Sequence, residues 1–379
     1  MEENYRFERY RNLKREAREG ININPIQTGG RLTEAAKKAL LEYGDGYSVC
    51  DYCEGNLFEI RKPDIKTFRD DLAKFVGADE VVFTHGAREA IYLVLSSILE
   101  KGDSIVVDEN RHYTTDLAVE KCGLNKILVK NSGYPEFKIN VEDYIPAIEK
   151  HKPKAILLTY PDGEFGNLPD AKKLGKIAKE YGIPFIVNGA YSVGRMPVNM
   201  KELGADFIIG SGHKSMASSG PIGILGISAR FEEKILQPSK TVKNKFCSIL
   251  GCTVRGVPLI TLMASFPEVV KRVSNWEEEV KKARYFCEKF EEMGNGKIRL
   301  LGEKPHNHDL MKFETPLFFE ISKKHPYGRE FLYRILKKHR IFGIKHGITK
   351  YLKISTYGLS YDEIDYVLSV FEKIIKGEV

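Results

Sequence analysis

Residues 206–216 read DFIIGSGHKSM, and this stretch decides the fold. Its apolar run predicts a short buried strand, which ends in small residues directly before His213 and Lys214. A lysine just beyond a strand end lies where α/β sheets hold their ligands. Partial desolvation there would lower the pKa of Lys214 and allow a Schiff base with an aldehyde cofactor. Taken alone, such a motif is more often a surface lysine in a Gly/Ser loop, so the rest of the chain has to decide.

The chain around this stretch alternates between short apolar runs and helical patterns. Within residues 86–103, Ile91, Val94, Leu95 and Ile98 recur at helical spacing. Alternation of strand and helix is typical of an α/β fold, in which helices cover both faces of a mainly parallel sheet. The predicted strands are 80–84, 104–108, 126–130, 154–160, 184–189, 206–212 and 222–228, and the predicted helices include 33–43, 64–77 and 86–103.

The pattern changes near residue 260. Two capping boxes, Ser274 to Glu277 and Ser360 to Glu363, are expected to open helices. Between them, residues 317–322 (LFFEIS) and 351–356 (YLKIST) are predicted as strands. The sequence therefore predicts two domains: 1–260, an N-terminal arm and a large domain, and 261–379, a smaller C-terminal α+β domain.

Bulk properties limit the class of protein. The chain has 379 residues, with 59 basic and 52 acidic side chains, and the resulting charge of +7 suits an anionic partner such as RNA without demanding one. It has no run of eighteen apolar residues, so no membrane span is expected. The charged N-terminus does not resemble a secretory signal, and a cytoplasmic protein is expected.

Three further segments place ligand-binding side chains after predicted strands. In FTHGAREA (83–90), Gly86 precedes a helix start bearing Arg88, which is an arrangement that binds phosphate. In VVDENRHYTTDLA (106–118), His112 or Tyr113 could stack on an aromatic cofactor. Asn188 ends another strand, where it could contact a pyridine nitrogen. A phosphate site, a stacking ring, a pyridine partner and an amine thus occur in this order.

Together these segments resemble the fold-type-I pyridoxal-phosphate enzymes, especially the branch with the cysteine desulfurases, over residues 64 to 379. Two departures are informative. Asn188 stands where that group normally has Asp, so the pyridine nitrogen is less strongly protonated, which favours β-elimination or β-replacement. Lys353 stands where many relatives carry an Arg that clamps the substrate carboxylate; Lys cannot form that fork, and an esterified carboxyl group does not require it.

Cys50 and Cys53 form a C-x-x-C pair, which can hold a metal, form a redox couple or carry sulfur. No second C-x-x-C completes a zinc site. The segment that contains the pair (24–57), together with 188–198 (NGAYSVGRMPV) and 210–225 (GSGHKSMASSGPIGIL), resembles the archaeal O-phosphoseryl-tRNA:cysteinyl-tRNA synthases.

The resemblance implies a homodimeric transferase that uses pyridoxal 5′-phosphate to replace the phosphate of O-phosphoseryl-tRNA(Cys) by sulfur, in cooperation with the synthetase that charges phosphoserine. It implies that Lys214 is the catalytic lysine. The implied cofactor-binding residues are Gly86, Ala87, Arg88, His112, Asp162, Asn167, Asn188, Ser211, His213 and Lys214.

The same resemblance implies that the C-x-x-C pair and one downstream cysteine deliver sulfur, as a persulfide or through an iron–sulfur cluster that they ligate. FCSILGCTVRG (246–256) offers Cys247 and Cys252 for the third position. Cys252 is preferred, beside Gly251, and Cys247 is interpreted as a core thiol. The expected catalytic and cluster-binding cysteines are therefore Cys50, Cys53 and Cys252.

Other interpretations remain open at this point. A cysteine desulfurase or selenocysteine lyase would act on a free amino acid, and a non-catalytic RNA-binding scaffold would keep the fold alone. His306 and His308, expected on one face of a strand, could bind metal, although a surface or substrate-facing pair is favoured. Cys122 and Cys287 are expected to be inert core thiols. The basic segment 240–246 could contact RNA.

Overall fold

The structure is a computed structural model that describes residues 13, 19–44, 63–242, 245–249 and 256–379. Its largest element is a seven-stranded sheet with the order β2-β8-β7-β6-β5-β3-β4. Strand β8 runs antiparallel to both of its neighbours, and the remaining pairs are parallel. The expectation of a mainly parallel sheet is confirmed. The strands are β2 (Glu80–Thr84), β3 (Ser104–Asp108), β4 (Asn125–Val129), β5 (Ala155–Thr159), β6 (Phe185–Asn188), β7 (Phe207–Ser211) and β8 (Gly223–Ile227).

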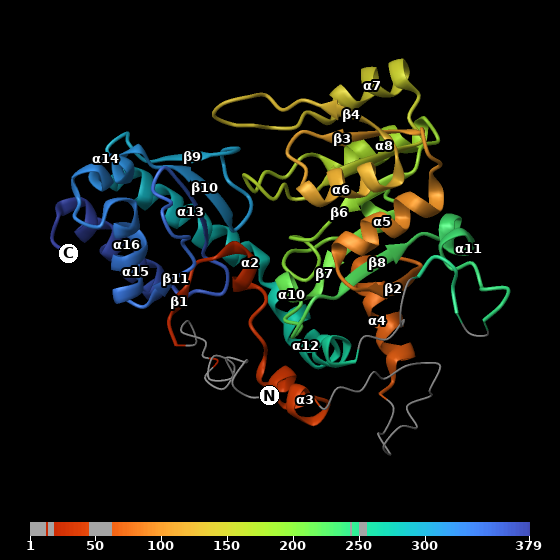
Figure 1. The fold of residues 1–379 in the computed structure, drawn as a ribbon, viewed down its shortest axis with the longest axis horizontal. Coiled ribbons are helices and arrows are strands. Elements are labelled where there is room, and N and C mark those ends of the chain that lie inside the picture. Colours follow the sequence, from red (N-terminus) through yellow and green to blue (C-terminus); the bar gives the residue numbers. More distant parts are fainter. Residues whose placement is uncertain (1–12, 14–18, 45–62, 243–244, 250–255) are drawn as a thin grey trace, which may run out of the picture.

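Helices cover both faces of this sheet, because its strands alternate their apolar side chains between two cores. Val106 faces one core, while its neighbours Ile105 and Val107 face the other. Helices α4, α7, α8 and α12 pack on the first face, and α5 and α6 pack on the second (Figure 1). Their bounds are α4 (Ile65–Val76), α5 (Ala87–Ile98), α6 (Tyr113–Cys122), α7 (Tyr144–His151), α8 (Ala171–Glu180) and α12 (Val257–Ser274).

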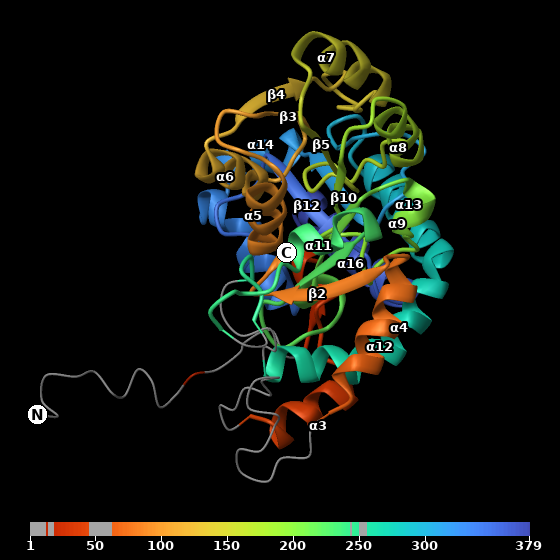
Figure 2. The same cartoon turned by 90° about the vertical axis from the view of Figure 1, so that its right-hand side faces the viewer.

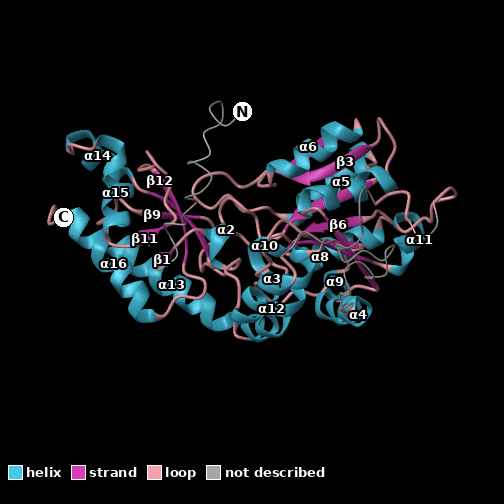
Figure 3. Cartoon of the chain, turned by 60° about the horizontal axis from the view of Figure 1, so that its bottom comes forward, coloured by secondary structure: helices cyan, strands magenta, loops and turns pink. Residues whose placement is uncertain are grey.

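A second body contains a three-stranded antiparallel sheet and four helices (Figure 3). The N-terminal segment joins it, because Ile21 and Asn22 pair in parallel with Ile341 and Phe342. Helix α2 then leads back to the large sheet, where it contacts α10. The elements of this body are β1 (Ile21–Asn22), β9 (Arg299–Leu301), β10 (Leu310–Glu314), β11 (Ile341–Phe342), β12 (Tyr351–Ser355), α13 (Trp276–Met293), α14 (Pro316–Lys324), α15 (Phe331–Lys338) and α16 (Tyr361–Lys376), and the connecting helices are α2 (Pro25–Thr28) and α10 (Gly212–Ser215).

The helix caps seen in the structure can be compared with those expected from the sequence. Thr33 caps α3 (Glu34–Glu42) by accepting from the Ala36 N–H at 3.0 Å, and α3 packs beside α12 (Figure 2). The capping box from Ser360 to Glu363 is present at the start of α16. The expected box at Ser274 is wrong: this residue ends α12, and its hydroxyl donates to the Lys271 carbonyl at 2.8 Å.

The predicted strand LFFEIS is also wrong, since it forms most of α14. Pro316 occupies the first turn of this helix, where its missing N–H is not needed. Phe318 and Ser322 are buried four residues apart on one helical face. Tertiary packing therefore overrides the strand preference of the aromatic and β-branched residues.

The division at residue 260 stays a prediction. Residue 260 lies inside α12, where Leu259, Leu262 and Val269 belong to the core of the large sheet. Phe286 of α13 belongs to the second core. Within the described ranges, no helix combines the length and the apolar character that a membrane crossing needs.

Candidate active site

Lys214 projects from the short helix α10, immediately after β7. Burial, and secondarily the positive charge of Arg195, lower the pKa of Lys214 to about 8. The ammonium group lies over the ring of Tyr191, with 4.5 Å between Nζ and the ring centroid. Tyr191 and Arg195 both follow β6, so two neighbouring strand ends position the amine. The result is a lysine whose neutral form is accessible near neutral pH.

Two glycines of the N-terminal segment pack directly beneath this lysine. A Cβ atom on Gly30 would stand 2.1 Å from the carbonyl oxygen of His213, and one on Gly29 would stand 2.7 Å from that of Lys214. Only glycine allows the two backbones to approach this closely. The Gly-Gly pair in NPIQTGG supports the family resemblance, but the sequence alone does not reveal this packing role.

His112 lies at the start of α6, close enough to Lys214 for the two charges to interact. Burial, followed by the positive charges of Lys214, Lys353 and Arg88, lowers the pKa of His112 to about 4. The ring is therefore neutral, and its Nδ1 lies 2.9 Å from the Thr114 hydroxyl. Its flat surface can stack on another aromatic ring. The three cations around it make this region favourable for an anion.

A helix N-terminus adds to that favourable field. Helix α5 begins at Ala87 after Gly86, which adopts a φ of 138°. The first N–H groups of the helix and its dipole favour a phosphate at this place. Arg88 donates from Nη2 to the hydroxyl of Tyr113, at 2.8 Å. This contact links the helix start to the residue after His112.

The remaining strand ends supply polar groups. Asn188 is the last residue of β6, is buried, and accepts the Ala190 N–H through Oδ1 at 3.4 Å. Ser211 ends β7, and its hydroxyl lies 3.4 Å from Nδ1 of His213. Both strands end at the same edge of the parallel sheet, where α/β proteins bind their ligands.

Asp162 and Asn167 hold the loop beside the site in shape. The Asp162 carboxylate accepts the backbone N–H groups of Glu164, Phe165 and Asn167, and burial raises its pKa to about 6. Asn167 donates to the carbonyl oxygens of Glu136 and Phe137 at 2.9 and 3.0 Å. Direct contact of these two side chains with a cofactor stays a prediction.

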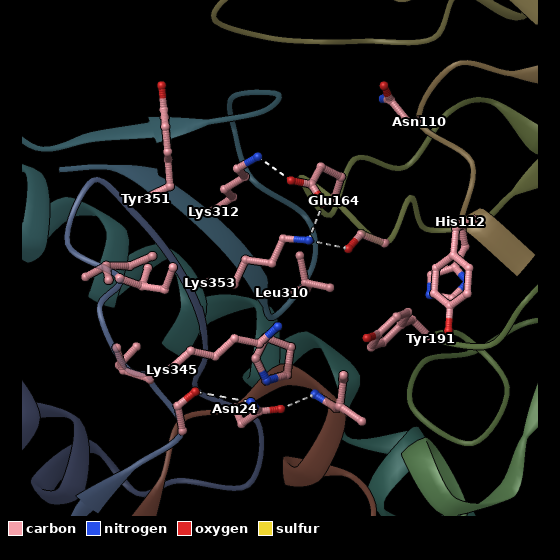
Figure 4. A pocket seen from close by; sticks show the side chains of 18 of the residues that line it. Asn24, Asn110, His112, Glu164, Tyr191, Leu310, Lys312, Lys345, Tyr351 and Lys353 are labelled. Carbon is pink, nitrogen blue, oxygen red and sulfur yellow. Dashed lines mark hydrogen bonds and ion pairs between the residues drawn. The ribbon is translucent and has the colours of Figure 1, made fainter. Parts of the chain in front are cut away.

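A cavity of about 770 Å³ opens between the two bodies, and of the residues described above it is lined by His112, Tyr113 and Tyr191. His112 and Tyr191 line its large-domain side, and Lys312, Lys345 and Lys353 line the opposite side (Figure 4). Asn24 closes the cavity from the N-terminal segment. The sequence points to Lys353 but not to the other two lysines, which lie on separate elements and form no motif.

The glutamate between the lysines has no sequence signal either. Glu164 makes ion pairs with Lys312 through Oε1 and with Lys353 through Oε2. Lys353 also donates to the Gly163 carbonyl oxygen at 3.1 Å. No short-range pattern connects Glu164 with lysines that lie in the other body, so only the fold reveals this contact.

A buried ion pair joins the two bodies directly behind Lys214. Nε of Arg195 lies 3.0 Å from Oδ1 of Asp309, and both side chains are fully buried. Nη1 and Nη2 of Arg195 donate to the Pro25 carbonyl at 2.8 Å and to the Thr28 hydroxyl at 2.5 Å. The hydroxyl of Ser355 donates to Oδ2 of Asp309. One guanidinium group therefore ties the segment after β6, α2 and the loop before β10 together.

Cys50, Cys53 and Cys252 lie outside the described residues. Of the other cysteines, Cys287 is buried and burial raises its pKa strongly, as expected of an inert core thiol. Cys247 is exposed, so its interpretation as a core thiol is wrong.

The histidine pair does not form the expected arrangement. His306 and His308 lie in the loop before β10, both buried, and not on a strand or at the surface. Nε2 of His306 lies 2.7 Å from the Leu310 carbonyl oxygen, and Nε2 of His308 lies 3.3 Å from that of Tyr191. Among the residues that the structure describes, no group of three potential ligands could hold a metal ion.

The donor set fits pyridoxal 5′-phosphate. A buried amine of lowered pKa suits its aldehyde, and a neutral imidazole suits its ring. The α5 N-terminus and the nearby cations suit its phosphate, and the Asn188 amide suits its pyridine nitrogen. The residues that would hold the cofactor are Gly86, Ala87, Arg88, His112, Asn188, Ser211, His213 and Lys214.

Comparisons with known proteins agree with this chemistry. The family described as O-phosphoseryl-tRNA(Sec) selenium transferase, SepSecS, matches residues 71–376. The O-phospho-L-seryl-tRNA:Cys-tRNA synthase of Methanosarcina acetivorans is 50% identical over 98% of this chain and 97% of its own length. The synthase of the same name from Methanocaldococcus jannaschii is 51% identical over 98% of this chain and 100% of its own length.

Solved structures show the same relationship. A structure of a SepCysS complex with the N-terminal domain of SepCysE is similar with a TM-score of 0.92 and 49% identity, covering 99% of this chain and 100% of that one. A cysteine desulfurase from Thermococcus onnurineus has a TM-score of 0.74 at 24% identity, with 95% of each chain covered, which shows the shared fold.

Proposed function

The chain belongs to the family of O-phospho-L-seryl-tRNA:Cys-tRNA synthases, and on this premise we propose that it converts O-phosphoseryl-tRNA(Cys) into cysteinyl-tRNA(Cys). The reaction releases phosphate from the β-carbon and adds sulfur there, with pyridoxal 5′-phosphate as cofactor. The observation that carries this proposal is the buried Lys214, with a pKa of about 8, which follows β7 and lies with its Nζ 4.5 Å from the ring of Tyr191, a residue that lines the cavity.

When bound, pyridoxal 5′-phosphate supplies an aldehyde for an amine and an electron-withdrawing ring. Lys214 is the base placed to take up the Cα proton of the substrate, because burial lowers its pKa to about 8 and so increases the neutral fraction of its amine. His112 is neutral and cannot compete for that proton at neutral pH, so it acts as a flat, uncharged wall. The two bodies and the N-terminal segment enclose the cavity and limit the access of water.

Asn188 and Lys353 set the type of reaction and of substrate. A neutral amide at the end of β6 supports protonation of a pyridine nitrogen less than a carboxylate does, which favours loss of a β-leaving group over transamination. Lys353 cannot make the two-pronged contact by which an arginine holds a free carboxylate. An aminoacyl ester of tRNA has no such carboxylate and does not need the contact.

Sulfur delivery is assigned to Cys50, Cys53 and Cys252. Three thiolates can ligate three irons of a four-iron cluster and leave one iron open, or one thiol can bear a persulfide that another resolves. Replacing any one by Ser should abolish cysteine formation from a protein donor and spare part of the phosphate release, which depends on Lys214. A structural zinc site would instead show loss of folding on the same replacements.

The partners follow from the substrate and from the relatives. We infer contacts with tRNA(Cys), for which the charge of +7 is suitable, and cooperation with the synthetase that supplies phosphoseryl-tRNA. A homodimer is inferred from the family resemblance. A SepCysE-like protein is a further inferred partner, because a relative has been solved in complex with the N-terminal domain of SepCysE.

One assay tests the proposal. The holoenzyme is incubated with phosphoseryl-tRNA and sulfide, and the amino acid on the tRNA is then identified. Cysteine is the expected product, and Lys214→Ala should give none. Recovery of unchanged phosphoserine on the tRNA would overturn the proposal, and release of sulfur from free cysteine would favour the desulfurase interpretation instead.

A further inference from the structure

Lys312 and Lys353 form a directly opposed pair on two neighbouring antiparallel strands. Lys312 of β10 pairs with Lys353 of β12 in the sheet register. Like charges placed opposite each other in this way destabilise a sheet unless an anion lies between them. The side chain of Lys312 is only 17% exposed and that of Lys353 is 37% exposed, so water screens their repulsion incompletely. This pair therefore requires a counter-ion.

In the structure that counter-ion is Glu164. One carboxylate oxygen contacts each lysine, and the dashed contacts lie within the cavity (Figure 4). Burial opposes ionisation of Glu164, but the two ammonium groups still hold the pKa of its carboxyl group below its ordinary value. Its backbone is anchored by Asp162, whereas its side chain is 44% exposed. The carboxylate can thus rotate away without unfolding the loop.

The charge of the cavity matches a dianion. Lys345 extends into the same space, and no ion pair of Lys345 is seen within the described part of the chain. Three ammonium groups and the Glu164 carboxylate leave two positive charges. Arg111, which also lines the cavity, is paired with Asp116, and His112 on the opposite wall is neutral. A phosphate monoester carries about −1.5 to −2 charges near pH 7. Lysine ammonium groups are suitable point charges for phosphate.

We propose that Lys312, Lys345 and Lys353 form the receptor for the phosphoryl group of the substrate, and that Glu164 is an internal counter-ion which this group displaces. The proposal rests on the proposed function for the identity of the substrate. The receptor faces His112 and Tyr191 across the cavity, so the leaving phosphate would be held on the side away from these two rings. The lysines would also neutralise the charge that the departing phosphate gains.

Binding of inorganic phosphate to the holoenzyme, measured by calorimetry, tests the receptor without tRNA or turnover. Lys353→Gln should weaken phosphate binding about tenfold or more, as expected when a hydrogen bond to a charged group is lost. Glu164→Gln should strengthen binding, because the competing carboxylate is gone. If the ion pair between Lys353 and Glu164 were only structural, the two substitutions would not be expected to change phosphate affinity in opposite directions.

Lys297→Gln is a matched control. It removes an exposed lysine of the same body that also pairs with a glutamate, at 2.9 Å from Glu320, outside the cavity. Phosphate affinity should be unchanged. Unaltered affinity in Lys353→Gln, or unaltered or weaker affinity in Glu164→Gln, would overturn the receptor. If Lys353→Gln does not fold, the sign of the Glu164→Gln effect decides alone.

A phosphodiester of the tRNA backbone offers the same chemistry, and uncharged tRNA separates the two sources. Equal affinity of wild type and Lys353→Gln for uncharged tRNA assigns the receptor to the phosphoseryl group, whereas a matching loss would assign it to the backbone and overturn the proposal. Failure of the proposed function looks different. A holoenzyme that makes no cysteinyl-tRNA, yet shows both shifts in phosphate affinity, keeps the receptor and loses only the assigned substrate.

Discussion

Uptake of pyridoxal phosphate by the apoenzyme should accelerate with pH through a transition centred near pH 8. The amine of Lys214 has a pKa of about 8 because it is buried and lies near Arg195. At a pH of about 7.5 roughly a quarter of it is unprotonated, against about one in a thousand for an ordinary lysine. The structure therefore predicts condensation about 200-fold faster than for an exposed lysine at that pH.

Stopped-flow absorbance of the cofactor, recorded across the pH range, measures this transition. Lys214→Arg keeps the positive charge but cannot react, so it should show no uptake and serves as the control. Borohydride reduction of the loaded wild type, followed by peptide mapping, should find the cofactor fixed on Lys214. A midpoint above about pH 10, as for a free lysine, or a label on another residue, would refute the reasoning.

The lowered pKa of Lys214 also makes the stability of the apoenzyme depend on pH. Between pH 8 and the ordinary lysine value, the unfolded chain binds a proton at Lys214 that the folded apoenzyme does not. The stability of the apoenzyme should therefore rise with pH across this window, by up to about 3 kcal/mol. Thermal unfolding of apo wild type against Lys214→Met checks this, because the variant should lack the rise.

Three further outcomes are expected. Asp309→Asn leaves the buried charge of Arg195 without its counter-ion and should lower the free energy of unfolding, measured in urea, by about 3–5 kcal/mol. The double variant Arg195→Met/Asp309→Leu should restore most of this loss. A loss below about 1 kcal/mol for Asp309→Asn would contradict a buried pair. Gly30→Ala should lose the cofactor absorbance, since its Cβ would meet the His213 carbonyl at 2.1 Å, whereas Gly220→Ala, with its nearest contact at 3.4 Å, should retain it. Free phosphoserine should be a poor substrate beside phosphoseryl-tRNA, and turnover of the tRNA should fall steeply with salt; comparable kcat/KM for both substrates would count against the esterified substrate.

The large sheet was predictable because each strand and helix carries its own local signal. EVVFT and SIVVD coincide with β2 and β3, since both runs are buried on both faces. The strand predicted for LFFEIS is wrong because its local signal is misleading. Its residues favour a strand intrinsically, and only the preceding Pro316 and the packing of Phe318 against the second core decide for a helix. A short apolar run does not carry enough information to settle that choice.

In the candidate site, too, some residues could be predicted from the local sequence and others could not. Lys214, His112 and Asn188 each follow or end a strand, so local patterns are sufficient to place them at one sheet edge. Glu164 and Lys312 belong to a loop of one body and a strand of the other, and neither has an informative sequence neighbourhood. Their contact depends on how the two bodies meet, which the ion pair between Arg195 and Asp309 fixes and which no local pattern expresses.

Lys353 shows how the two kinds of information combine. From the sequence, it signals that no carboxylate clamp is required; from the structure, it is already paired with Glu164. A free monoanionic carboxylate would have to replace a carboxylate that is attached to the same loop and so is always at high effective concentration. Replacing the Glu164 carboxylate by another carboxylate leaves the negative charge beside the lysines unchanged. A phosphoryl dianion brings one more negative charge, which the same lysines attract. The arrangement therefore selects against the carboxylate of a free amino acid and in favour of a phosphorylated side chain at the same position.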